Sequence, residues 1–228
     1  MQHAVTPPRR AVPSARRRRP SLVLVAGLMS LLAGAALLGF YLWQAYLDPV
    51  VDTVATQREV QVLKQQWSAE PTPEATTASS PLPDRAVALL RVPEFGSAFE
   101  VSVLAGTSEA ALSRGVGWFD GSAPPGGVGN FAVAGHRGKD GPFVPLLDLH
   151  VGAIVEVETQ QAIFTYRLTN EPSQLTVDKH DTWVLDSVPG EPAARPTKAL
   201  ITLITCRNFF HSPERSVAFG ELVGVLTK

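Results

Sequence analysis

The sequence contains a single cysteine, Cys206, and lacks several short motifs that mark common enzyme classes. A chain with one cysteine cannot form an internal disulfide bond. The patterns GxSxG, HExxH, the P-loop and CxxC are also absent, which argues against a serine hydrolase elbow, a zinc protease, a phosphate-binding loop and a redox pair. We therefore expect no cofactor and no metal, and the lone thiol is the group that needs an explanation.

Acidic residues are missing from positions 1–20, which contain six arginines. This segment carries a charge of +6, whereas the remaining 208 residues carry −7. A run of 26 residues without any charge, 22–47, follows it, and about 20 apolar residues suffice to cross a bilayer. Because basic residues gather on the cytoplasmic side, we predict a cytoplasmic tail over 1–20, a transmembrane anchor over 21–47 and an extracellular remainder. This arrangement favours a membrane partner over nucleic acid.

A cleavable signal peptide is the alternative interpretation of the apolar run. Ala33-Gly34-Ala35 resembles a cleavage site, but the apolar sequence continues beyond it through Phe40, whereas the apolar core of a signal peptide is shorter. Aromatic residues also gather at the outer end, where they settle at a lipid–water boundary; they are Phe40, Tyr41, Trp43 and Tyr46. The sequence therefore favours an uncleaved anchor.

Residues 48–84 are expected to form an extracellular stalk between the anchor and a catalytic domain over 85–228. Apolar residues are loosely spaced over 48–69, consistent with a helix that continues out of the membrane. The segment 70–83 contains four prolines and no aromatic residue, a composition that forms a semi-rigid spacer instead of a packed core.

The domain over 85–228 is predicted to be mostly β. Short β-rich runs are separated by Gly, Pro and Asp turns, a pattern of barrels and sandwiches between which periodicity does not decide. Two short helices are expected at 107–114 and 143–149. The candidate strands are 86–91, 99–103, 130–134, 153–159, 162–169, 174–178, 199–205 and 216–227, the last with a break at Gly220.

Three residues from distant positions combine into a candidate catalytic site. Cys206 follows the buried-strand run ALITLIT, His136 follows a second apolar run, and Arg215 lies nine residues after the cysteine. Reactive groups are often placed where a rigid strand leaves the core. These residues would supply a nucleophile, an acid/base and a cation that stabilises an oxyanion or holds the substrate.

Other residues compete for each of these roles. A lone cysteine is often an inert small hydrophobe, and His136 could be a solvated loop residue. Arg137 and Arg207 are rival cations, although Arg207 should point to the opposite face because it follows Cys206 directly. Three further histidines are alternatives for the base: His150, His180 and His211.

The motifs TLITC (202–206) and GN-x4-GHR (129–137), together with Arg215, resemble those of sortases, the cysteine transpeptidases of Gram-positive cell surfaces. The similarity covers roughly 85–228. It implies a closed eight-stranded sortase-type β-barrel, with Cys206 as nucleophile, His136 as general acid/base and Arg215 as the clamp. From its position alone, Thr205 is expected to pack within the strand, whereas the resemblance favours a contact between its hydroxyl and the substrate.

The resemblance implies the substrates as well. Sortases cut a surface protein between Thr and Gly of an LPXTG-type signal, hold the acyl group as a thioester and pass it to an amine. For wall-anchoring members this amine belongs to lipid II or the peptidoglycan stem; for pilin polymerases it is a lysine.

Three features favour a class E-like housekeeping sortase, a class that tends to prefer LAXTG, with class D next. The only Asp-Pro pair, Asp48-Pro49, is followed by Val50 and so does not match the lid of pilin polymerases. The chain also ends at Lys228 without a second membrane helix, and nine residues separate Cys206 from Arg215. The alternatives are a pilin-polymerising sortase, a hydrolytic cysteine protease and a non-catalytic, surface-anchored β-barrel binding module.

Overall fold

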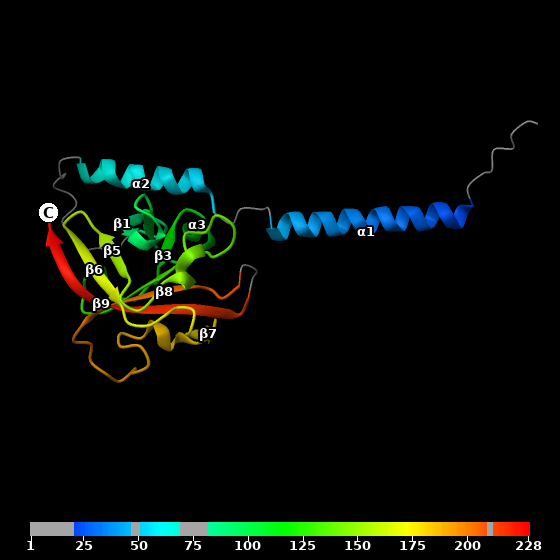
Figure 1. Cartoon of the computed structure of the whole chain (residues 1–228). Helices are drawn as coiled ribbons and strands as arrows, with labels where there is room; N and C mark the ends of the chain where they lie inside the picture. The colour runs from blue at the N-terminus through cyan, green and yellow to red at the C-terminus, as the bar shows by residue number, and fades with distance from the viewer. Residues whose placement is uncertain (1–20, 47–50, 69–81, 209–211) are drawn as a thin grey trace, which may run out of the picture. The chain divides into compact units, whose positions relative to one another are not determined.

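The structure is a computed structural model that describes residues 21–46, 51–68, 82–208 and 212–228. It divides into two compact units, Met1–Gln44 and Ala45–Lys228, which are considered separately (Figure 1). The basic tail 1–20, the pair Asp48-Pro49, most of the proline-rich spacer and His211 lie outside the described residues.

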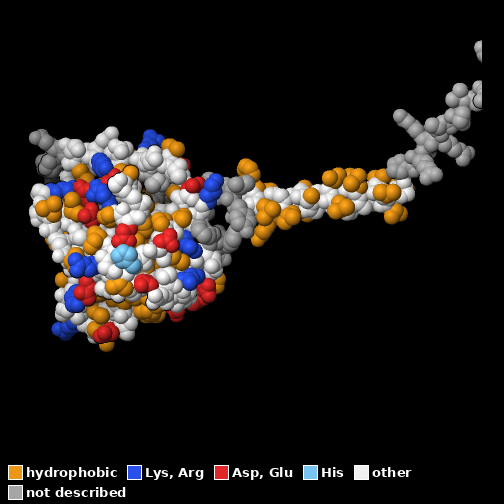
Figure 2. Space-filling view, viewed as in Figure 1, with side chains coloured by type: hydrophobic (Ala, Val, Ile, Leu, Met, Phe, Trp, Pro, Cys, Tyr) orange, Lys and Arg blue, Asp and Glu red, His pale blue; other side chains and the backbone are white. Residues whose placement is uncertain are grey.

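The first unit contains one long helix, α1 (Leu22–Tyr46). The hydroxyl of Ser21 accepts a hydrogen bond from the Leu24 N–H (3.2 Å) and so caps the helix start. Over Leu22–Trp43 the helix is long and apolar enough to cross a membrane. Figure 2 shows hydrophobic side chains along it, whereas the visible face of the second unit carries mixed charges.

The second unit is built on a closed β-barrel of eight strands. Their order is β6-β5-β1-β2-β3-β4-β8-β9, and β9 pairs again with β6. The pairs β2–β3 and β4–β8 are parallel, so the barrel is mixed. The strands are β1 (Ala86–Arg91), β2 (Val101–Ala105), β3 (Val116–Trp118), β4 (Gly129–Ala134), β5 (Ile154–Glu158), β6 (Ala162–Leu168), β8 (Ala199–Cys206) and β9 (Glu214–Thr227).

The predicted eight-stranded barrel is confirmed, but two of its strands differ from the expected set. The expected strand at 174–178 forms β7 (Thr176–Asp178), which pairs only with β9 and lies outside the closed ring. The three-residue strand β3 completes the ring and was not predicted. The strand expected at 99–103 begins two residues later, at Val101. The break expected at Gly220 does not occur, because β9 continues through this residue. A Cβ atom at this position would lie only 2.9 Å from Ile201 Cγ2, so a larger residue would crowd Ile201.

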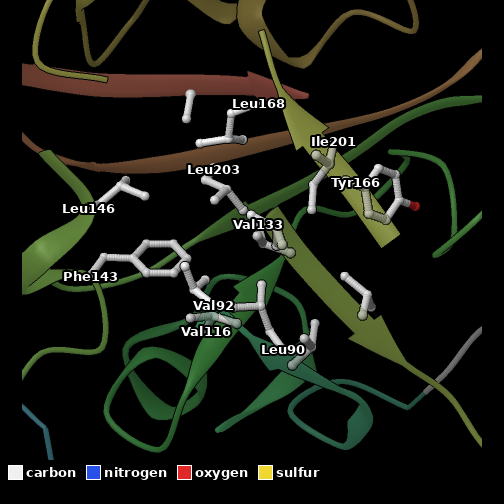
Figure 3. Close-up of a cluster of buried hydrophobic side chains, with 14 of the residues drawn as sticks. Leu90, Val92, Val116, Val133, Phe143, Leu146, Tyr166, Leu168, Ile201 and Leu203 are labelled. Carbon is white, nitrogen blue, oxygen red and sulfur yellow. The ribbon is translucent and has the colours of Figure 1, made fainter. Parts of the chain in front are cut away.

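The barrel interior is filled by buried aliphatic and aromatic side chains (Figure 3). The helix expected at 143–149 is the 3₁₀ helix η3 (Val144–Asp148). Leu146 of this helix and Phe143, the residue before it, both pack in the barrel interior. The Tyr166 hydroxyl accepts a hydrogen bond from the Gly126 N–H (2.7 Å). Burial raises the pKa of Tyr166 to about 12, so this phenol stays neutral in the core.

Short helices connect the strands around the barrel. The expected helix at 107–114 is the single turn α3 (Glu109–Leu112), which Ser108 caps by accepting a hydrogen bond from the Ala111 N–H. Two further 3₁₀ turns are η2 (Pro93–Phe95) and η4 (Thr182–Leu185).

Helix α2 (Thr53–Ser68) lies against the outside of the barrel, over β1 and β2 (Figure 1). Leu89 alternates with the inward-facing Ala88 and Leu90 and therefore points outward, yet it is fully buried by Val60, Leu63 and Trp67 of the helix. This part of the segment expected as a stalk is thus packed on the barrel.

Polar contacts fix both ends of α2. At its start, the carboxylate of Asp52 accepts a hydrogen bond from Ala55 N–H (2.9 Å), and the Asp52 N–H donates to the Ser113 carbonyl (2.9 Å). Near its end, the ammonium of Lys228 lies 4.7 Å from the ring centroid of Trp67. The helix is therefore tied to α3 at one end and to the last residue of the chain at the other.

Candidate active site

Cys206 and Arg215 face each other across two antiparallel strands. They are the last aligned pair of β8 and β9 at this end of the barrel. Residues directly opposite in an antiparallel pair project on the same face, with Cβ atoms about 4.5–5.5 Å apart. Both residues are partly exposed, so the register brings sulfur and guanidinium to one accessible face.

His136 reaches the same end of the barrel from β4. Strands β4 and β8 are parallel, with Ala134 aligned to Ile204. One residue further on, the Gly135 N–H donates to the Ile204 carbonyl (3.0 Å). His136 and Cys206 each lie two residues beyond the aligned pair, so both residues lie at the same end of two neighbouring strands.

Thr205 links these two strand ends through its side chain. Its hydroxyl donates to the carbonyl of Gly135 (2.8 Å), and the residue is buried. Because side chains alternate along a strand, Thr205 lies on the face opposite to Cys206. The structure therefore places this hydroxyl under the backbone that precedes His136.

Replacing Thr205 by valine should disturb both stability and activity. The change keeps the shape of the side chain but leaves the buried Gly135 carbonyl without its donor, at a cost of about 1–3 kcal/mol in the free energy of unfolding. Denaturant unfolding and peptide turnover measure the two effects. Thr205→Ser retains the hydroxyl and is the matched control; a valine variant as stable and active as the serine variant would contradict this role.

The imidazole of His136 is mostly enclosed, with 19% of its side chain exposed. Its Nε2 atom is buried, makes no hydrogen bond, and lies 3.4 Å from the carboxylate of Glu109 in α3. Of the alternative histidines, His150 is exposed beside Glu94, and His180 is exposed in the turn after β7. Among the histidines that the structure describes in the barrel unit, only His136 follows a strand paired with β8.

The rival cations Arg137 and Arg207 take different positions. Arg207 Nη1 donates to the Ser173 carbonyl (2.6 Å) and to the Ser216 hydroxyl (3.4 Å). Ser216 is paired with Thr205, so Arg207 lies on the face opposite to Cys206, as expected from strand alternation. Arg137 Nη1 donates to the carbonyl of Arg207.

Arg215 holds its guanidinium near its own strand. Nη1 donates to the carbonyls of Ser212 (2.5 Å) and Glu214 (3.1 Å). These two hydrogen bonds orient the planar guanidinium at the end of the barrel where Arg215 pairs with Cys206.

Acidic side chains of the barrel wall are engaged in ion pairs. Glu158 pairs with Arg91 and Lys228. Within the described ranges, no group of three or more His, Cys, Asp or Glu side chains is arranged to hold a metal ion.

The fold and the site together define a class: a closed mixed β-barrel with a cysteine, a histidine and an arginine at neighbouring strand ends. A family model described as the sortase domain matches residues 90–223. The chain belongs to the sortase family, and it is a sortase transpeptidase. No curated protein matches the sequence closely enough to add to this assignment.

Solved structures similar to this chain include class E sortases. Sortase E1 from Streptomyces coelicolor, solved with a tripeptide in its active site, is 30% identical with a TM-score of 0.55, and the match covers 65% of this chain and 94% of that one. Sortase E from Streptomyces avermitilis is 28% identical with a TM-score of 0.58, covering 64% and 93%. The SrtF sortase from Corynebacterium diphtheriae is 25% identical with a TM-score of 0.62, covering 70% and 94%.

Proposed function

We propose that this chain is a membrane-anchored sortase that cleaves an LPXTG- or LAXTG-type sorting signal between Thr and Gly. It then transfers the acyl group to a cell-wall amine. The observation that carries this proposal is the register of three strand ends, which brings Cys206, His136 and Arg215 to one end of the barrel.

These three residues divide the chemistry between them. The sulfur of Cys206 attacks the threonine carbonyl carbon and forms a C–S bond. The His136 imidazolium gives its proton to the glycine nitrogen, so the C–N bond breaks and a free amine leaves. The acceptor amine next attacks the thioester, its proton passes to His136, and the Cys206 thiolate is released.

Arg215 acts on the charge that develops during this reaction. A tetrahedral intermediate places a negative charge on the former carbonyl oxygen, and fixed donors at that point lower the barrier. The guanidinium is permanently charged and offers donors in a planar fork. Its position opposite Cys206 supports a role in oxyanion stabilisation, substrate positioning or both.

Arg215→Lys should lower kcat/KM by about 100-fold or more, because an ammonium cannot reproduce the planar donors and loss of one oxyanion donor has effects of this size. Steady-state cleavage of a fluorogenic sorting peptide measures the loss. Arg195→Lys, the same change at an exposed site, is the matched control and should be neutral. Near-normal turnover by Arg215→Ala would remove this residue from the mechanism.

Helix α1 supports an anchored enzyme whose N-terminal tail is cytoplasmic and whose barrel is extracellular. Its apolar length fits a bilayer, and the six arginines before it favour this orientation. The donor protein and a lipid-linked acceptor, lipid II or the peptidoglycan stem, would then meet the barrel at the same membrane surface.

A peptide panel tests donor and acceptor together. The full chain in detergent micelles is incubated with LAXTG and LPXTG peptides, with and without a diaminopimelate-type or glycine-type amine. We expect cleavage after threonine, a preference for LAXTG as in the class E resemblance, and an amide product when the amine is present. Release of only the free acid would favour a hydrolytic protease, and uncleaved peptides would contradict the proposed function.

A further inference from the structure

Arg137 joins the strand that carries the histidine to the strand that carries the cysteine. It follows His136 directly, and its Nη1 donates to the carbonyl of Arg207, the residue after Cys206. The N–H of Arg207 in turn donates to the carbonyl of Glu214 at the start of β9 (3.0 Å). The side chain of Arg137 is therefore bound to a peptide unit that is already held against β9.

This contact is the outermost of three that join the end of β4 to β8. The first runs from the Gly135 N–H to the Ile204 carbonyl, and the second from the Thr205 hydroxyl to the Gly135 carbonyl. The contact from Arg137 lies beyond them. These contacts therefore lie on both sides of the proposed catalytic pair. His136 lies between Gly135 and Arg137, and Cys206 lies between Thr205 and Arg207.

Arg137 lies among other charged groups. Burial and the neighbouring Arg207 guanidinium lower the pKa of Arg137, whereas Asp148 of η3 and Cys206 act in the opposite direction. The other ionisable groups at this end of the barrel are His136, which precedes Arg137 just after β4, and Arg215 of β9.

We propose that Arg137 is a positioning residue that fixes Cys206 relative to His136 by binding the backbone after the nucleophile. This inference rests on the proposed function. Its role differs from that of Arg215, because its hydrogen bond joins the end of the histidine strand to the end of the cysteine strand, whereas the hydrogen bonds of Arg215 go to carbonyls of its own chain segment. The role needs the planar donor group, so lysine should replace it only in part.

The test compares Arg137→Lys and Arg137→Met with the unchanged full chain in detergent micelles. Because Cys206 is the only cysteine, the rate of iodoacetamide alkylation at each pH reports on this one thiol without any peptide substrate. We expect Arg137→Met to slow the alkylation of Cys206, because the thiol is then no longer held in position relative to His136, and Arg137→Lys to slow it less. The exposed Arg195→Met is the matched control for loss of a positive charge.

Turnover of the sorting peptide supplies the second readout. We expect Arg137→Lys to lower kcat/KM by about tenfold, since it keeps the charge but loses the planar group that reaches the carbonyl. If Arg137→Met does not fold, the lysine variant decides the positioning role. Unchanged kcat/KM in Arg137→Lys, or an unchanged alkylation profile in a folded Arg137→Met, overturns the proposal. Failure of the unchanged chain to cleave any peptide would instead contradict the proposed function.

Discussion

Cys206→Ala is expected to abolish peptide cleavage and transfer, with a loss of at least about four orders of magnitude in kcat/KM. The proposed reaction passes through a covalent bond to this sulfur, and removal of a nucleophile costs that much or more in enzymes of this type. Turnover of the sorting peptide by the full chain measures the loss.

The same variant should remain folded. Cys206 lies at the end of β8 and is partly exposed, so replacing its side chain leaves no large cavity in the core, and the free energy of unfolding should change by less than about 1 kcal/mol. Thermal unfolding separates the two outcomes. A folded alanine variant that still forms the amide product would contradict the assignment of the nucleophile, whereas an unfolded one would assign Cys206 a structural role.

Removal of α2 should destabilise the barrel even though the helix lies far from Cys206 in the sequence. Residues Val60 and Leu63 are buried against Leu89, and burying one such side chain stabilises a protein by about 1.5–3 kcal/mol. Deletion would also remove the ion pairs of Glu59 with Arg114 and of Lys64 with Glu100. A chain that starts at residue 85 should therefore unfold at a lower temperature than one that starts at residue 51, or aggregate.

Point variants give the sharper form of this test. Leu63→Ala should cost about 2–5 kcal/mol, which corresponds to roughly 5–20 °C in a domain of this size. Val60 is 6% exposed and Val54 is 74% exposed in the same helix, so Val60→Ala and Val54→Ala form a matched pair. Equal melting temperatures for the two valine variants would show that α2 does not stabilise the barrel.

The position of the candidate catalytic pair, Cys206 and His136, could be predicted from a simple sequence pattern. An apolar run that ends at a polar reactive residue predicted that Cys206 and His136 lie at strand ends, and β8 and β4 end close to those positions. The pattern could not predict that these strands are parallel neighbours, because pairing depends on contacts between distant segments. The family resemblance supplied that information through the barrel that it implied.

Strand β3 and the position of β7 were missed for a physical reason. Three residues, Val116–Trp118, are too few to produce a detectable alternation, and this strand is defined by its neighbours β2 and β4. Conversely, 174–178 has strand-like composition, but only Thr176–Asp178 pairs, and it does so outside the ring. Local pattern predicts that a strand forms and not which partner it finds.

The packing of α2 had a signal in the sequence. Val60, Leu63 and Trp67 recur at the spacing of one helical face, which favours burial of that face against a partner. The interpretation as a stalk gave more weight to the membrane anchor before the helix and the prolines after it. The partner residue, Leu89, could not be identified from sequence, because a strand within a barrel is expected to be covered on its inner face alone.

The most direct test of the central claim is to trap the acyl group on the enzyme. The full chain is incubated with a LAXTG peptide, without an acceptor amine, and the intact protein is analysed by mass spectrometry with peptide mapping. We predict an added mass equal to the peptide up to its threonine, attached at Cys206, which disappears when the amine is added and is absent from Cys206→Ala. Cleavage of the peptide without any adduct at Cys206, or an adduct on another residue, would contradict this prediction.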